Sequence, residues 1–142
     1  IEKLGRLSLW KLAIKPGKPF AFGDVKGTPF LALPGNPVAA FATFILLCRP
    51  YLLTKQGVSN ISTTTFTLPA NFSRNKAGMR QEYLQANAEI VDGTMMVNTY
   101  PNQSSGVLSS TCWGNGLVLA PIGQTIKQGQ DVMFMPYSDL LY

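Results

Sequence analysis

Three lysines near the start of the sequence are of a type and spacing that can bind an anion. Lys15 and Lys18 flank Pro16-Gly17, and a β-turn brings the Cα atoms at its two ends within about 7 Å. Lys11 shares a strand face with Lys15, at a Cα distance of about 13 Å. Two ammonium groups could converge on one oxyanion while the third holds a distant part of an elongated polyanion. The alternative is that strand lysines simply face water.

A second candidate for anion binding is the segment Leu33-Pro34-Gly35-Asn36-Pro37. Asn36 is a good N-cap, and Pro37 suits the first helical position because its missing N–H would have no partner there. Gly35 permits close backbone approach, and a helix N-terminus offers free N–H groups to an anion. An ordinary strand-to-helix turn is the alternative. The segment is neither a Walker loop nor a dinucleotide fingerprint, because Gly35 lacks partner glycines at the required spacing.

Composition excludes several kinds of chemistry and localises the positive charge. The 142 residues contain no His, which excludes Ser-His and Cys-His nucleophilic mechanisms and most zinc sites within this sequence. Residues 1–57 hold eight basic and two acidic side chains, whereas residues 58–142 hold four and five. The charge therefore favours a local anionic ligand in the first part. Cys48 and Cys112 are expected to be buried free thiols, which fits a cytoplasmic protein.

The first part of the sequence predicts a small α/β unit. Apolar alternation, the turn at Lys26-Gly27 and the helix cap predict strands at residues 7–15, 19–25 and 28–33, followed by a helix over residues 37–55. Pro50 should kink or break this helix, and Gly57 should end it. Its apolar run of about a dozen residues is shorter than the roughly 20 of a membrane span. We therefore expect a core helix buried between other elements.

The remainder of the sequence predicts a small all-β unit. β-branched and aromatic runs alternate with turn signals such as Asp92-Gly93 and Asn115-Gly116, giving strands at residues 63–68, 81–91, 94–100, 116–121 and 131–135. The fold class expected is thus an α/β fragment followed by a β-barrel, with domains at residues 1–57 and 58–142. Because three strands and one helix enclose little core, the first part is expected to complete a larger domain.

The combination of motifs resembles the molybdopterin molybdenumtransferase family, which includes bacterial MoeA and the E domain of gephyrin. The resemblance rests on Lys11-x-x-x-Lys15-Pro16-Gly17-Lys18-Pro19-Phe20-Ala21-Phe22-Gly23 followed by Leu33-Pro34-Gly35-Asn36-Pro37-Val38. It implies that residues 1–57 are the last part of the three-layer molybdopterin-binding α/β domain. It also implies that residues from about 60 are the C-terminal β-barrel domain.

The resemblance implies an activity and roles for particular residues. The family inserts molybdate into adenylylated molybdopterin with Mg²⁺ and releases AMP. Lys15 and Lys18 match its catalytic lysines, whereas Lys11, Pro19, Ser105 and the segment Pro34-Gly35-Asn36-Pro37 match substrate-binding positions. The resemblance further implies a homodimer and Mg²⁺ ligands mainly outside this sequence. No paired carboxylates stand at a metal-binding spacing, so no metal ligand is expected within the sequence. No nucleic-acid or membrane partner is expected. The fragment alone is expected to be inactive.

Two positions depart from the family pattern. Gln85, which falls at a substrate-binding position, stands where the family has Arg, and Ala39 stands where a Ser is usual. These departures motivate a second hypothesis, a noncatalytic binding or scaffolding module of the same fold. Nucleic-acid binding is a third hypothesis, which the sequence disfavours because aromatic residues do not interleave with the lysines on one strand face.

Overall fold

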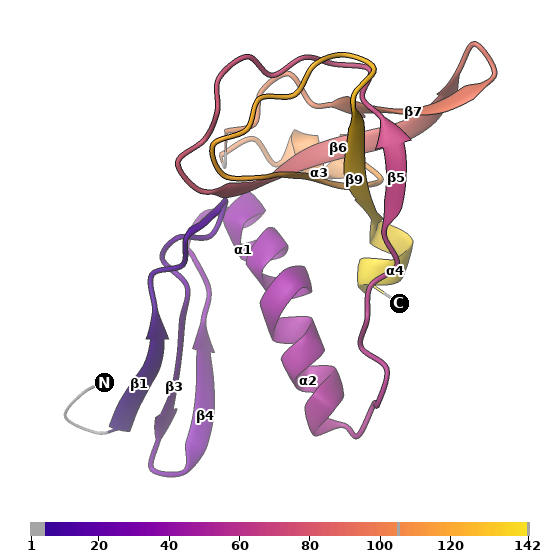
Figure 1. The fold of residues 1–142 in the computed structure, drawn as a ribbon. Coiled ribbons are helices and arrows are strands. Elements are labelled where there is room, and N and C mark those ends of the chain that lie inside the picture. Colours follow the sequence, from indigo (N-terminus) through magenta and orange to yellow (C-terminus); the bar gives the residue numbers. More distant parts are fainter. Residues whose placement is uncertain (1–4, 105, 142) are drawn as a thin grey trace.

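The computed structural model describes residues 5–104 and 106–141. In the described part the chain is mostly β-sheet with few helices, and Figure 1 shows a three-stranded sheet and a larger sheet with one long helix below the latter. The smaller sheet is antiparallel, in the order β1 (Gly5–Trp10), β3 (Ala21–Val25) and β4 (Thr28–Ala32). The predicted turn between β3 and β4 is confirmed, because Lys26 and Gly27 have φ values of 52° and 83°.

The single strand predicted at residues 7–15 is wrong. β1 ends at Trp10, and the backbone of Lys11 takes a φ of 60°, which turns the chain out of the extended path. The short strand β2 (Ile14–Lys15) then pairs with the other sheet. Lys11 and Lys15 therefore belong to different structural elements and do not share one strand face.

The larger sheet contains six strands around a long central strand. β6 (Gln81–Val91) pairs with three neighbours: β2 in parallel, and β7 (Thr94–Thr99) and β8 (Gly116–Ala120) in antiparallel. β8 continues to β9 (Asp131–Pro136), and β9 to β5 (Phe66–Pro69). Beyond β5, one bridge between Ala70 and Val97 connects the two ends of the sheet. A single isolated bridge is not a continuous strand pairing, so the described strands form a curled sheet and the expected closed barrel is not found.

The long helix begins where the sequence predicts. The Asn36 side chain accepts hydrogen bonds from the backbone N–H groups of Val38 and Ala39, and α1 runs over Pro37–Thr43. A π-helical turn, η1 (Phe44–Cys48), leads into α2 (Arg49–Lys55). The wide turn lies just before Pro50, whose ring cannot fit against an ordinary preceding α-turn.

The helix is less enclosed than the sequence predicts. Over Pro37–Lys55 it has 19 residues, and its length and apolar composition alone would allow a membrane span. Only 33% of its most apolar 18-residue window is buried within the chain. Packing explains the partial enclosure: Tyr51 contacts Phe22 of the smaller sheet edge to face, Phe41 contacts Tyr137, and other helix residues remain exposed.

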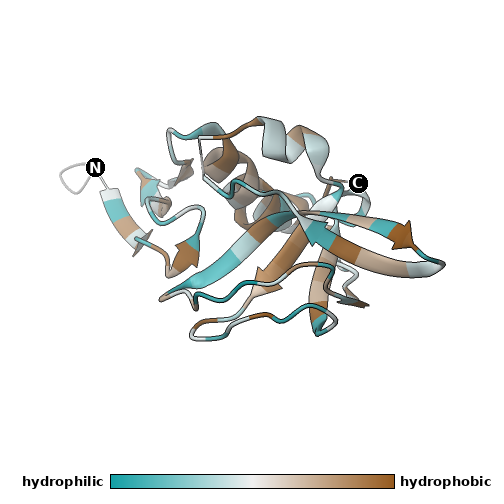
Figure 2. Cartoon of the chain, turned by 90° about the horizontal axis from the view of Figure 1, so that it is seen from above, coloured by the Kyte–Doolittle hydropathy of each residue, from teal (hydrophilic) through white to brown (hydrophobic). Residues whose placement is uncertain are grey.

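Two apolar clusters organise the structure, and side-chain alternation along β6 separates them. Leu84 and Ala86 point into the interior of the curled sheet, against residues such as Val118 and Phe134. Tyr83 points to the opposite face, where a second cluster joins the sheet to the helix. Its members are Ile45, Leu117, Met135 and Leu140, with partly buried neighbours. Figure 2 shows the apolar residues, in brown, along the sheet strands and the helix.

Two short helices and one cysteine differ from expectation. The sequence did not predict α3 (Ser109–Trp113) or α4 (Tyr137–Leu141), each only five residues long. Cys48 is a buried free thiol as predicted, and burial raises its pKa. Cys112 is also free but exposed, so its predicted burial is wrong.

Candidate functional site

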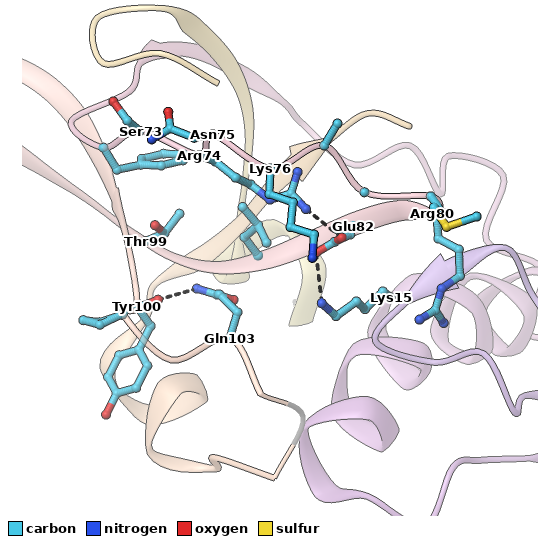
Figure 3. Close-up of a pocket in the computed structure, with 16 residues that line it drawn as sticks. Lys15, Ser73, Arg74, Asn75, Lys76, Arg80, Glu82, Thr99, Tyr100 and Gln103 are labelled. Carbon is cyan, nitrogen blue, oxygen red and sulfur yellow. Dashed lines mark hydrogen bonds and ion pairs between the residues drawn. The ribbon is translucent and has the colours of Figure 1, made fainter. Parts of the chain in front are cut away.

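A cleft of about 820 Å³ lies at one end of the curled sheet. Its wall comes from β2, from the loop between β5 and β6, from the start of β6 and from the segment after β7 (Figure 3). Four basic side chains and one carboxylate line it: Lys15, Arg74, Lys76, Arg80 and Glu82. The lining carries an excess of three positive charges, so the cleft favours an anionic ligand.

Glu82 is the carboxylate at the centre of this group. Its Oε2 lies 3.4 Å from the Lys15 Nζ, and its Oε1 lies 2.7 Å from the Arg74 Nη2. The parallel pairing of β2 with β6 places Lys15 directly beside Glu82. The Glu82 side chain is 9% exposed, whereas that of Lys15 is 47% exposed. Lys15 can therefore contact both this buried carboxylate and a ligand in the cleft.

Hydrogen bonds from Arg80 and Gln103 stabilise the two sides of the cleft. Arg80 donates a hydrogen bond from Nη1 to the carbonyl oxygen of Ile14 at 3.2 Å, which ties β2 to the start of β6. Gln103 accepts from the backbone N–H of Gln85 and donates to the carbonyl oxygens of Gln85 and Tyr100. The segment after β7 is thereby held against the middle of β6.

Of the predicted lysine group, only Lys15 lines this cleft. Lys18 and Pro19 form the corner of a turn in which the backbone N–H of Phe20 donates to the carbonyl oxygen of Gly17. The turn therefore spans residues 17–20 and does not have Lys15 and Lys18 at its ends. Lys11 is exposed, with its Nζ 5.9 Å from the centre of the Trp10 ring.

The second predicted group lies at the start of the helix. Pro34 is buried, Gly35 and Pro37 are exposed, and Asn36 caps α1. An atom placed at the Cβ position of Gly106 would lie 3.9 Å from the Asn36 Nδ2 and 3.9 Å from the Ser104 Oγ. The helix start and the polar turn after β7 are therefore neighbours. Ser105 itself lies outside the described residues.

Gln85 points away from the cleft. Glu82 and Leu84 line the cleft, and the alternation of side chains along β6 sends Gln85 to the opposite face of the sheet. Gln85 is 2% exposed, and its Oε1 accepts a hydrogen bond from the hydroxyl of Tyr137. Burial raises the pKa of this hydroxyl well above its ordinary value, so the hydroxyl stays protonated and remains a donor.

The acidic side chains of the described residues do not gather into a metal-binding cluster. No three His, Cys, Asp or Glu side chains cluster in the described ranges. The one carboxylate in the cleft, Glu82, is already paired with two cations. The chemistry that this cleft can perform is therefore to bind and orient an anion between fixed positive charges.

Sequence reasoning missed most of the cleft. In the sequence, Arg74, Lys76 and Arg80 flank Gly78 in a predicted loop, where charged side chains by default face water. Glu82 has no second acidic residue at a metal-binding spacing. The sequence feature that could have identified the cleft is a high density of charged residues. Four of the five charged side chains that line the cleft fall within residues 74–82.

The sequence matches the family described as MoeA C-terminal region (domain IV) over residues 67–137. The molybdopterin molybdenumtransferase of Haemophilus influenzae is 34% identical over 144 residues, covering 99% of this chain and 36% of that protein. The molybdenum cofactor synthesis protein cinnamon of Drosophila melanogaster is 32% identical over 120 residues, which cover 82% of this chain and 20% of that protein.

A solved structure gives the same assignment. A crystal structure of the molybdopterin biosynthesis MoeA protein from Pyrococcus horikoshii aligns with a TM-score of 0.76 at 26% identity, covering 96% of this chain and 33% of that chain. The chain thus spans about a third of the length of the Haemophilus influenzae and Pyrococcus horikoshii proteins. With half of its residues in the family match and nearly all of them in the structural alignment, the chain belongs to the MoeA family of molybdopterin molybdenumtransferases.

Proposed function

We propose that this chain is the C-terminal part of an enzyme that inserts molybdate into adenylylated molybdopterin and releases AMP. Its relatives are named for molybdopterin molybdenum transfer and molybdenum cofactor synthesis, which supports a role in making the molybdenum cofactor. The observation that carries the proposal is the position of Lys15. This residue of the Lys-Pro-Gly-Lys motif projects into a cleft with an excess of positive charge.

The role of the lysines is electrostatic. Adenylylated molybdopterin and molybdate are both anions, so bringing them together costs energy through charge repulsion. Fixed cations offset this repulsion, and preorganised charge of this kind is commonly the largest contribution to catalysis. In this proposal Lys15 and Lys18 contact molybdate and substrate oxygens, with Pro19 adjoining. Lys11, Ser105 and the segment 34–37 contact the rest of the substrate.

The proposal extends to the complete protein. The full-length enzyme is a cytoplasmic homodimer, and residues 1–57 complete its molybdopterin-binding domain while residues 58–142 form the C-terminal domain. In this proposal the Mg²⁺ ligands lie mainly outside this chain, which agrees with the lack of a cluster of three His, Cys, Asp or Glu side chains among its described residues. This chain alone is then inactive.

The test measures AMP release and molybdate insertion by the full-length protein. Lys15→Ala and Lys18→Ala should each lower turnover about 100-fold or more, the scale expected when an oriented charge at the reacting groups is lost. Lys26→Ala is the matched control, since Lys26 lies in the exposed β3–β4 turn, away from the cleft. Unimpaired turnover in both Lys15→Ala and Lys18→Ala would remove the assigned roles.

A second candidate is a noncatalytic binding or scaffolding role. The position of Gln85 favours it, because this residue brings no cation where the family has Arg and its amide is engaged with Tyr137. Ala39, which lacks the usual hydroxyl, is 4% exposed at the start of the helix. Measurable turnover when molybdate and adenylylated molybdopterin are added to the full-length protein would exclude a purely structural role.

A further inference from the structure

Glu82 pairs with two cationic side chains, and neither a general base nor a metal ligand would require such pairing. Both of its carboxylate oxygens are committed to cations, one to Lys15 and one to Arg74. The Arg74 contact is a short charge-assisted hydrogen bond of 2.7 Å to a side chain that is 19% exposed. Arg74 also has its backbone fixed, because its N–H and C=O pair with Ile126 at 2.7 and 3.0 Å. Arg74 therefore holds the Glu82 oxygen that is not paired with Lys15.

The absence of a side chain at Gly78 leaves room for the Glu82 carboxylate. A Cβ atom at position 78 would lie 2.3 Å from the Glu82 Oε1 and 3.1 Å from the Arg74 Nη2. Any residue other than glycine would push the carboxylate out of its place. Gly78 is fixed in turn, because its carbonyl oxygen accepts from the backbone N–H of Gly123 at 2.9 Å.

Arg74 and Gly78 thus fix the position of Glu82, and Glu82 in turn contacts Lys15. Lysine is a flexible point charge with considerable rotamer freedom, so an ammonium group that must meet an anion in one place gains from a fixed partner. We infer that Glu82 is a positioning residue that holds the Lys15 ammonium at the mouth of the cleft, in the orientation in which it meets the anionic substrate. This inference rests on the proposed function.

The test is a double-mutant cycle in the full-length protein, with turnover and the KM for molybdate as readouts. Glu82→Gln keeps the shape of the side chain and an acceptor for Arg74 but loses the charge that holds Lys15. It should lower kcat about 10-fold, within the range that a misplaced group costs. The KM for molybdate should not rise, because the cleft gains net positive charge. In a Lys15→Ala background, Glu82→Gln should cause no further loss, since it acts through Lys15.

Gly78→Ala supplies a second perturbation that leaves the charge unchanged. It moves the carboxylate by contact, so kcat should again fall with no further loss in the Lys15→Ala background, while the KM for molybdate stays the same. Glu89→Gln is the matched control. Glu89 lies exposed on the same strand, outside the cleft, where it accepts a hydrogen bond from Asn98. Its turnover should equal that of the parent protein.

The outcomes separate the two ideas. If Lys15→Ala is impaired while Glu82→Gln and Gly78→Ala turn over normally, the positioning role is overturned and the proposed function stands. If the losses in Glu82→Gln and Gly78→Ala are undiminished in the Lys15→Ala background, Glu82 serves folding alone and the inference fails. An unimpaired Lys15→Ala overturns the positioning role, and the proposed function falls with it only if Lys18→Ala is unimpaired as well.

Discussion

At the scale of single residues, Gln85 and Tyr137 form a buried polar pair that links β6 to α4. The Tyr137 hydroxyl donates to the Gln85 Oε1, while the Gln85 Nε2 is buried and makes no hydrogen bond among the described residues. A buried amide whose NH2 group has no acceptor is costly, and loss of the one partner of its oxygen adds to that cost. This pair therefore contributes more to stability than an exposed hydrogen bond does.

Tyr137→Phe should lower the free energy of unfolding by about 1–3 kcal/mol, because the Gln85 oxygen then has no donor. Tyr100→Phe is the control, since the Tyr100 hydroxyl meets Ser109 at an exposed site and its loss should cost within about 0.5 kcal/mol. Denaturant unfolding of the three proteins measures both values. Equal losses in the two variants would show that burial of the Gln85 pair adds nothing.

At the scale of elements, the loop that carries Lys15 and Lys18 packs against the long helix. Gly17 is buried between the loop and the helix, with a φ of 120°. A Cβ atom there would lie 2.3 Å from the Thr43 Cγ2 and 3.3 Å from the Ile14 Cδ1. Thr43 is itself buried, and its hydroxyl donates to the carbonyl oxygen of Ala39 at 2.7 Å. The helix thereby sets the position of the loop that carries Lys15 and Lys18.

Gly17→Ala should destabilise the chain more than Gly27→Ala, although both glycines have positive φ. At Gly27 a Cβ would meet nothing within 4 Å, so only the backbone cost of about 1–2 kcal/mol applies. At Gly17 the contact with Thr43 adds about a further 1–3 kcal/mol of overpacking. The difference between the two unfolding free energies reports the contact with Thr43 together with the larger backbone cost of alanine at a φ of 120°, and a difference near zero would contradict the docking contact.

At the scale of the whole molecule, the two halves of the chain are joined by packing as well as by the linker. Ile45 of the helix packs with Leu117, Met135 and Leu140 of the C-terminal half, and β2 adds a strand to the larger sheet. Residues 57–62, by contrast, are exposed and outside helices and strands. Apolar packing and strand pairing therefore connect the halves in addition to this linker.

Limited proteolysis with a nonspecific protease should cut first between residues 57 and 65, because exposed segments outside helices and strands are the preferred sites of nicking. The two fragments should remain together on gel filtration, since the shared cluster and the β2–β6 pairing still hold them. Separation under native conditions would show that the halves are independent. Mass spectrometry of the fragments locates the cut.

Several elements could be predicted from the sequence because short-range chemistry decides them. β6, the β3–β4 turn and the Asn36 cap depend on alternation, turn residues and capping side chains within a few positions. α3 and α4 could not be predicted in this way. Helices of five residues have no amphipathic period and depend on tertiary packing.

What the sequence by itself determined is the family, the order of the main elements and the presence of a cationic motif at Lys15 and Lys18. Only the tertiary structure decided which charges meet. Lys15 and Glu82 are adjacent because β2 leaves the path of β1 at Lys11 and pairs in parallel with β6. Gln85 lies away from the cleft because neighbouring side chains on a strand point to opposite faces. Contacts between residues far apart in sequence follow from strand pairing, which no local pattern contains.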